Sequence, residues 1–207
     1  MEAGHCLRHA LYGLNQARLV WWQALKKSME KLGFTSLSSD AGLFLFRNKN
    51  SFIIAIIYVD DAIFCGPLPA LVNHLKEEFK NIWETQDLGN VTEFLCMRIT
   101  RSGSKIHLDQ CAYLETVLQR CRMQNAKSAT TPLPAGYVPT LSVGAPIPEI
   151  RSRFQTVIGS LLYLMLGTCP DIAFAVTKLA QHAANPSKEH LERALYICHY
   201  LVGTSKY

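Results

Sequence analysis

The stretch "AIIYVDDAIFCGP", from Ala55 to Pro67, places two adjacent aspartates between two runs of apolar residues. The run before the aspartates is "SFIIAIIYV" and the run after them is "AIFCG". Both runs are rich in β-branched and aromatic residues, so they predict two strands with Asp60 and Asp61 at a tight turn between them. Neighbouring side chains on a regular strand point to opposite faces, so the two carboxylates can serve one site only if the backbone turns here.

Two interpretations of this acidic pair stay open from these residues alone. Carboxylates are ligands for hard divalent cations, and phosphoryl transfer uses two such ions about 3.5–4 Å apart. Aspartate is also common at ordinary hairpin turns, because it tolerates the turn geometry and hydrogen-bonds its own backbone.

The segments around the turn predict a small antiparallel sheet with flanking helices. Residues 41–47 ("AGLFLFR") and 51–59 are separated by "NKN", which is typical of a hairpin. Residues 51–59 are apolar at nearly every position, which favours a central strand covered on both sides. A helix is expected over 16–33, and an amphipathic helix over 69–83. The apolar stripe of the second helix is expected to comprise Leu71, Leu75, Phe79 and Ile82.

The second half of the chain predicts one more hairpin and then helices. "EFLCMRIT" and "KIHLD" flank the turn "RSGS", and residues 110–123 are expected to be helical. Five prolines lie within residues 124–150, so this segment is expected to be a linker or a long surface loop. Residues 151–207 predict only helices, arranged as a bundle of three helices of about 12–16 residues each.

Composition narrows the class of protein. The 207 residues allow one domain or two small ones, and an apolar content of 49% is enough for a hydrophobic core. The formal net charge of +5 suits a polyanionic partner such as nucleic acid, bound by a folded surface. No apolar run reaches the roughly 18 residues that a membrane span needs, and the N-terminal residues do not resemble a signal peptide. We therefore expect an intracellular protein, cytoplasmic or nuclear, that is not secreted.

The seven cysteines are scattered and include no C-x-x-C pair. This pattern argues against a zinc site and against a disulfide framework. Cys65, Cys96 and Cys198 lie in apolar contexts and are expected to be small core residues with reduced thiols.

Further motifs follow the order of a known family. Together with "YVDD", they resemble the reverse transcriptase domain of Ty1/copia-type LTR retrotransposon polyproteins. The resemblance implies a polymerase with palm, fingers and thumb, which copies an RNA or DNA template with two Mg²⁺ ions. The motifs are "ALYGLNQARLVWW" (10–22), "LGFTSLSSDAGLF" (32–44), "DLGNVTEFLCMRIT" (87–100), "IGSLLYLMLGTCPDIAFAV" (158–176) and "ANPSKEHLERALYICHYLVGT" (184–204).

The resemblance assigns roles to residues in "YVDD" (58–61) and in "LYGLNQA" (11–17). Asp60 and Asp61 are implied to be catalytic carboxylates that bind the metal, with Tyr58 beside the primer terminus. "LYGLNQA" is similar to the family's motif B, which implies that Gly13 and Gln16 border the incoming dNTP and the template.

The segment "FLCMRI" is similar to the hairpin that grips the primer strand in this family. Leu95, Cys96 and Met97 are therefore implied to hold the primer. Cys96 stands where the family usually has glycine, so the tightness of this turn is in question. The template-primer, made of RNA or DNA, is the implied nucleic-acid partner.

The expected fold class is α+β, a partial polymerase palm followed by a helical thumb-like bundle. The expected domains are a fingers and palm part over 1–123, a proline-rich connection over 124–150 and a thumb-like region over 151–207. The family's third catalytic aspartate, in its motif A, precedes "LYGL", where this sequence has only Glu2 as an acidic residue.

We therefore expect a reverse transcriptase fragment, without motif A and RNase H, that is inactive alone and binds Mg²⁺ weakly at most. The alternative is a repurposed module derived from a retroelement. Such a module would bind nucleic acid, or a protein partner that covers the surfaces left by the missing parts.

Overall fold

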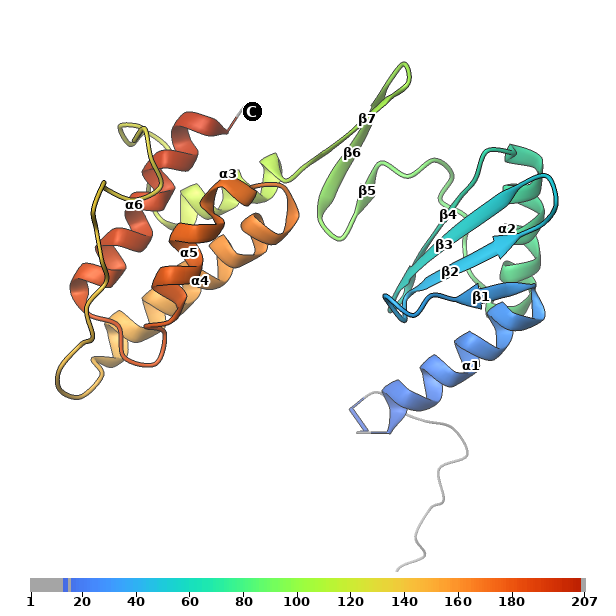
Figure 1. Cartoon of the computed structure of the whole chain (residues 1–207), viewed down its shortest axis with the longest axis horizontal. Coiled ribbons are helices and arrows are strands. Elements are labelled where there is room, and N and C mark those ends of the chain that lie inside the picture. Colours follow the sequence, from blue (N-terminus) through green and yellow to red (C-terminus); the bar gives the residue numbers. More distant parts are fainter. Residues whose placement is uncertain (1–12, 15, 206–207) are drawn as a thin grey trace, which may run out of the picture. The chain divides into compact units, whose positions relative to one another are not determined.

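A computed structural model describes residues 13–14 and 16–205 of the chain. The chain divides into two compact units, Met1–Val91 and Thr92–Tyr207. The first unit contains α1, β1–β4 and α2, and the second contains β5–β7 and α3–α6 (Figure 1). Mixed α and β structure with antiparallel sheets was expected and is confirmed. Over the described residues, no helix combines the length and the apolar character that crossing a bilayer requires.

The first unit is built on a four-stranded antiparallel sheet in the order β1-β2-β3-β4. Its register pairs Tyr58 with Asp61, so Val59 and Asp60 are the two residues of the turn between β3 and β4. The predicted hairpin around the acidic pair is therefore confirmed. The strands are β1 (Phe34–Ser36), β2 (Leu43–Arg47), β3 (Phe52–Tyr58) and β4 (Asp61–Cys65).

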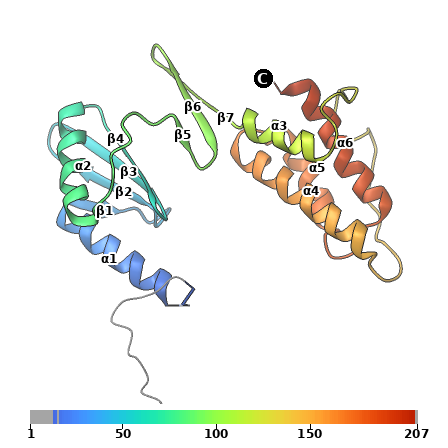
Figure 2. The ribbon, with the colours of Figure 1, turned by 180° about the vertical axis from the view of Figure 1, so that it is seen from behind.

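Helices α1 (Ala17–Lys31) and α2 (Pro69–Trp83) supply the rest of the core of this unit (Figures 1 and 2). Both helices place apolar side chains on the same face of the sheet, where burial of apolar surface stabilises the unit. The buried residues of this core are Leu25, Met29, Phe34, Phe44, Ile53, Ala55, Ile57, Leu75 and Phe79.

The prediction that β3 is covered on both sides is wrong. Its residues alternate in burial, with Ile53 and Ala55 fully buried but Ile54 only half-buried and Phe52 44% exposed. Strand β3 is internal to the sheet, yet α1 and α2 pack on one face only. A run that is apolar throughout cannot reveal from its pattern which face is covered. We call the other face of the sheet, with Leu43, Leu45, Ile54, Ile56 and Ile63, the open face.

One position of the α2 stripe also differs from expectation. Ile82 is 44% exposed, and the half-buried Trp83 packs against Phe79 in its place, with ring centroids 6.5 Å apart. The helix ends at Trp83, and Glu84, the residue that follows, has a positive φ of 48°.

The second unit begins with a three-stranded antiparallel sheet in the order β5-β6-β7. Strands β6 (Met97–Ser102) and β7 (Lys105–Asp109) form the predicted hairpin around "RSGS". The short strand β5 (Glu93–Phe94) pairs with β6 through Phe94 and Met97, so Leu95 and Cys96 form a two-residue turn.

Four helices follow the hairpin and share one core. The predicted bundle lengths need correction, because α4 begins five residues before "RFQTV", with Pro148 at a favoured first helical position. Helix α5 is shorter than expected, since a 3₁₀ turn over Pro170–Ile172 precedes it. The helices are α3 (Cys111–Arg120), α4 (Pro148–Gly167), α5 (Ala173–Ala180) and α6 (Lys188–Thr204).

The proline-rich segment between α3 and α4 is irregular, as predicted, but it packs against the helices. The amide of Ala129 donates to the carbonyl of His199 at 3.1 Å. Arg193 lies over the Tyr137 ring, 4.9 Å from its centroid. Helix α3 shares its core with α4 and α6, and the expected domain limits at residues 123 and 150 stay a prediction.

The cysteines follow the expectation only in part. Cys198 is buried as predicted, whereas Cys65 and Cys96 are exposed and contribute nothing to a core. Cys65 belongs to the open face of the sheet, and Cys96 occupies a turn.

Candidate functional site

The turn between β3 and β4 has a strained backbone. Val59, the first of its two residues, has a φ of 53° and is 54% exposed. A β-branched residue at positive φ is a genuine outlier, and such strain concentrates at functional sites. Positive φ at the first turn residue alone is the pattern of a type II′ turn, whose twist matches the flanking strands.

The two aspartates of this turn are both exposed. Asp61 is the first residue of β4 and lies directly opposite Tyr58, so the two side chains belong to the open face of the sheet. Tyr58 is 57% exposed. Because water reaches both carboxylates, the adjacent like charges avoid the desolvation penalty that burial would impose.

These carboxylates fit one cation better than a pair of cations. Across the part of the chain that the structure describes, no group of three or more His, Cys, Asp and Glu side chains converges as a metal site. Mg²⁺ commonly binds through one or two carboxylates together with waters and substrate phosphates. Two neighbouring aspartates meet that requirement for a single ion, and their role as metal ligands stays a prediction.

The loop over residues 40–42, within the motif 32–44, supports β3 just before the turn. The carboxylate of Asp40 accepts a hydrogen bond from the amide of Gly42 at 2.7 Å, and the Gly42 carbonyl accepts one from Ile57 at 2.8 Å. A Cβ atom at Gly42 would lie 2.6 Å from the Ile57 carbonyl oxygen. Only glycine therefore allows this close approach, and the carboxylate of Asp40 holds the loop.

Gly13 and Gln16 lie before the first turn of α1, on a different element from the acidic turn. Gly13 has a φ of 94°, which favours glycine, and Gln16 is the residue that precedes the helix. Both are exposed. Their predicted roles beside the dNTP and the template stay predictions.

The turn between β5 and β6 is the second candidate element. Leu95 and Cys96 both have positive φ, 50° and 56°, which is the pattern of a type I′ turn. This turn type favours glycine and asparagine, so Cys96 is accommodated in a tight turn at a conformational cost. Met97, the first residue of β6, is half-buried.

Helix α4 holds this turn through Tyr163. Its hydroxyl donates a hydrogen bond to the main-chain carbonyl of Leu95. The ring packs edge-on against Tyr113, with centroids 4.7 Å apart. The motifs do not single out Tyr163, although a tyrosine within the apolar run "LLYLMLG" indicates a polar partner, since a buried hydroxyl usually finds one.

Gln110 forms a second link between the hairpin and α4. It is 3% exposed, and its amide oxygen accepts hydrogen bonds from the Thr168 amide at 2.9 Å and the Thr168 hydroxyl at 3.0 Å. Its amide nitrogen donates to the Tyr163 carbonyl at 3.3 Å. A Cβ atom at Gly167 would lie 2.3 Å from the Gln110 side chain. We call this set of contacts the Gln110 latch.

An ion pair ties β6 to β7 beside the latch. Arg98 donates to the carboxylate of Asp109 at 2.9 Å, and the amide of Cys111 donates to the other oxygen at 3.1 Å. The hydrogen bond from Arg98 lowers the pKa of Asp109 below its usual value. A cavity of about 400 Å³ lies here, lined by Thr92, Glu93, Cys96, Arg98, Ile99, Thr100, Asp109, Gln110 and Ala112.

The surplus of basic over acidic residues lies in the second unit. Residues 92–207 contain 12 Lys and Arg against seven Asp and Glu, whereas residues 1–91 contain nine of each. Arg101 and Lys105 lie exposed near the tip of the β6–β7 hairpin. A positive surface of this kind is suited to a phosphate backbone.

Comparison with known proteins gives one consistent result. The family model described as reverse transcriptase (RNA-dependent DNA polymerase) matches residues 2–135. The chain is 35% identical, over 96% of its length, to the retrovirus-related Pol polyprotein from transposon TNT 1-94 of Nicotiana tabacum. It is 33% identical, again over 96% of its length, to the corresponding polyprotein from transposon RE1 of Arabidopsis thaliana.

A third relative is a putative transposon Ty5-1 protein of Saccharomyces cerevisiae. It is 28% identical to the chain over 94% of the chain's length, and the chain covers 63% of that protein. The chain spans 16% of the tobacco polyprotein and 13% of the Arabidopsis polyprotein. No solved structure matches it significantly.

Proposed function

Because this chain belongs to the copia-type reverse transcriptases, we propose that it carries the metal-site turn, the primer-strand hairpin and the thumb-like region of such a polymerase. The observation that carries the proposal is the exposed Asp60-Asp61 turn at the end of the β3–β4 hairpin, within the residues that the family model matches. In this proposal residues 1–123 are the fingers and palm part, 124–150 the connection and 151–207 the thumb-like region.

The acidic turn is the proposed metal-binding element. A divalent ion supplies charge neutralisation for the phosphates and activation of the primer hydroxyl. Asp60 and Asp61 are the residues that hold it, and Tyr58, next to Asp61 on the open face, lies beside the primer terminus. The described carboxylates suit one ion and not two. We propose that the chain by itself binds the ion weakly and does not synthesise DNA.

The second unit is the proposed nucleic-acid-binding part. Leu95, Cys96 and Met97 hold the primer strand, and the surplus of basic residues in 92–207 contacts its phosphates. Tyr163 and the Gln110 latch keep the turn in a fixed position relative to α4. A gripping element needs such support, because loosely held binding groups lose affinity to conformational entropy.

Two assays on the purified chain test this proposal. Fluorescence anisotropy with a labelled RNA–DNA template-primer should show binding whose affinity falls as salt rises, because bound phosphates release counterions. Charge reversal at the hairpin tip, in Arg101→Glu with Lys105→Glu, should weaken binding, whereas Lys26→Glu with Lys27→Glu on α1 serves as the matched control. Binding that is equally weakened by both pairs contradicts the assignment to the second unit.

Primer extension with Mg²⁺ or Mn²⁺ is the second assay, and we expect no product from the chain alone. Asp60→Asn and Asp61→Asn should leave template-primer affinity in the absence of metal almost unchanged. Robust template-dependent synthesis that is abolished by Asp60→Asn would overturn the proposal of inactivity and would support a complete catalytic site.

A second candidate function is a repurposed binding module that captures a protein partner. The open face favours it, since Leu43, Ile54 and Ile56 lie side by side there and Phe52 is 44% exposed. Contiguous exposed apolar surface commonly marks an interaction site. Affinity capture with and without nuclease treatment separates the two functions, because only a protein partner held by protein contacts survives nuclease.

A further inference from the structure

The open face of the sheet in the first unit is a continuous apolar surface, and α1 and α2 pack on the opposite face. Ile56 lies between its cross-strand partners Leu43 and Ile63, so the three side chains are neighbours on the open face. Phe52 and Tyr58, at the two ends of β3, are 44% and 57% exposed. Contiguous exposed apolar surface of this kind marks an interaction site.

The two ends of this face carry opposite charges. Asp61 lies opposite Tyr58 at one end, and Arg47 lies opposite Phe52 at the other, so both charged side chains belong to the open face. The seven residues of β3 separate the two ends by about 20 Å, which is too far for these charges to pair within one chain. Both residues are exposed, and among the described residues neither has an ion-pair partner.

An apolar centre between a negative end and a positive end is complementary to itself. When a second copy faces the first about a two-fold axis between the two sheets, the Asp61 end of each copy lies over the Arg47 end of the other. Such a contact uses the same surface twice, as the commonest symmetric dimers do. Two sheets packed face to face lie about 10 Å apart, so their inner apolar side chains interdigitate.

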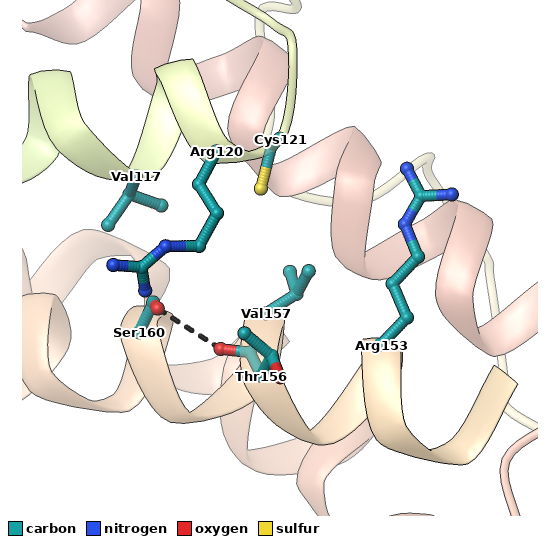
Figure 3. A pocket seen from close by; sticks show the side chains of 7 residues that line it. All are labelled: Val117, Arg120, Cys121, Arg153, Thr156, Val157 and Ser160. Atoms are coloured by element: carbon teal, nitrogen blue, oxygen red, sulfur yellow. Dashed lines mark hydrogen bonds between the residues drawn. The ribbon is translucent and has the colours of Figure 1, made fainter. Parts of the chain in front are cut away.

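The cavity between α3 and α4 is unsuited to a second copy. It has a volume of about 120 Å³, and its lining includes Arg120 from α3 and Arg153 from α4, on either side of it (Figure 3). A two-fold contact at this place would set the positive charges of one copy against those of the other, and like charges across an interface are unfavourable. The distribution of charge therefore favours the open face.

We propose that the open face binds a second copy of this chain and forms a two-fold symmetric dimer. Ile56 and its neighbours lie at the centre of the interface, and an ion pair between Asp61 of one copy and Arg47 of the other lies at each end. The inference goes beyond the proposed function and does not rest on it, because no metal or nucleic acid takes part. The interface is only three strands wide, so the dimer exchanges with the monomer at about micromolar concentration.

Sedimentation velocity of the full chain, treated with nuclease to remove nucleic acid, tests the proposal. Between about 1 and 100 µM the average sedimentation coefficient should rise from the value of a monomer to that of a dimer. Ile56→Thr keeps a β-branched residue in the strand but removes apolar surface from both copies, so it should weaken the dimer about tenfold. Thermal unfolding checks that this variant is folded. A chain that stays monomeric over this range, or a folded Ile56→Thr variant that dimerises as strongly as the original, overturns the proposal.

Exchange of the two charges separates this arrangement from other modes of self-association. Arg47→Asp and Asp61→Arg should each weaken the dimer about tenfold, because each replaces two attractive pairs with two repulsive ones. The double variant should regain most of the lost affinity, since opposite charges then meet again with their places exchanged. Lys27→Asp, an equal change of charge at an exposed position of α1, is the matched control and should leave the dimer unchanged.

Two results of the charge exchange contradict the proposal. Dimerisation that both single variants leave intact would point to another contact, such as pairing between the edge strands β4 of two copies. A double variant that is folded but regains no affinity would show that Asp61 and Arg47 do not meet across the interface.

Discussion

The hydroxyl of Tyr163 on α4 donates a hydrogen bond to the main-chain carbonyl of Leu95, in the turn between β5 and β6. This contact links α4 to a turn 68 positions earlier in the sequence. The proposed primer-gripping turn is therefore held by a side chain outside its own hairpin. Substitutions in α4 should therefore alter the turn even when the substituted residue does not contact nucleic acid.

Tyr163→Phe tests this link. Removing the hydroxyl leaves the Leu95 carbonyl without its partner, which should reduce the free energy of unfolding by about 1 kcal/mol. Hydrogen exchange at the turn amides should also quicken, and template-primer affinity should fall. Tyr113→Phe is the matched control, since the Tyr113 ring packs on Tyr163 and its ring is kept. Equal effects of the two variants contradict the proposed link.

Cys96→Gly should stabilise the protein. A positive φ of 56° is unfavourable for cysteine and acceptable for glycine, so relief of strain should exceed the entropy that glycine adds to the unfolded chain. We expect a gain of about 0.5–1 kcal/mol in urea denaturation. Thr100→Gly, in the extended part of β6, should destabilise instead. A loss of stability in Cys96→Gly is the contrary outcome.

The Gln110 latch makes a prediction about coupling between two positions. Gly167→Ala should destabilise, because the added Cβ lies 2.3 Å from the Gln110 amide and must displace it from Thr168. Gln110→Ala should cost about 1–3 kcal/mol by leaving the buried partners of the amide unsatisfied. The double variant should lose clearly less free energy of unfolding than the two single variants lose together. Urea denaturation of the original protein, the two single variants and the double variant measures this coupling. Additive losses of stability would mean that the two substitutions do not act on the same contact between Gln110 and Thr168, which contradicts the prediction.

His190 makes the stability of the second unit sensitive to acid. The residue is buried, its Nδ1 accepts from the Ser187 amide at 3.1 Å, and its ring stacks on His182. Burial, and then His182, lower the pKa of His190 below its usual value of 6.5. The unfolded chain therefore binds a proton more readily than the folded one, so stability is present above about pH 6.5 and is lost as the pH falls towards the folded-state pKa.

His190→Gln should flatten this pH dependence between roughly pH 5 and 7. Glutamine at this third helical position can still accept the hydrogen bond of the capping box. His107→Gln, at an exposed position of β7, should leave the slope unchanged. Thermal unfolding at several pH values across this range measures how the melting temperature depends on pH. If that dependence is unchanged in His190→Gln, His190 is not the titrating group.

Local sequence patterns were sufficient to predict the strands and turns that contain the candidate site residues. Turn residues between β-prone runs predicted three hairpins, including the one with Asp60 in its turn and Asp61 at the start of β4, because the geometry of a short turn depends on neighbouring residues. The same patterns predicted α2 to the residue and the irregular character of the proline-rich segment.

Contacts between distant residues could not be predicted in this way. The apolar run of β3 did not show which of its faces is covered, because Ile53 and Ile54 are chemically alike and differ only in what packs on them. Cys65 and Cys96 were expected in a hydrophobic core but are exposed to solvent. An apolar sequence context does not decide which face of a sheet or which turn a residue occupies. The contacts of Tyr163 and Gln110 depend on partners far away in the sequence.

The sequence by itself determined which family this chain belongs to and where its acidic turn and the Leu95–Cys96 turn lie, since ordered motifs and short turns are local properties. Only the tertiary structure decided that Tyr163 links the Leu95–Cys96 turn to α4, and that Gln110, directly after β7, is hydrogen-bonded to the end of α4. The physical reason is that packing brings together residues whose separation along the chain carries no information about their distance in space.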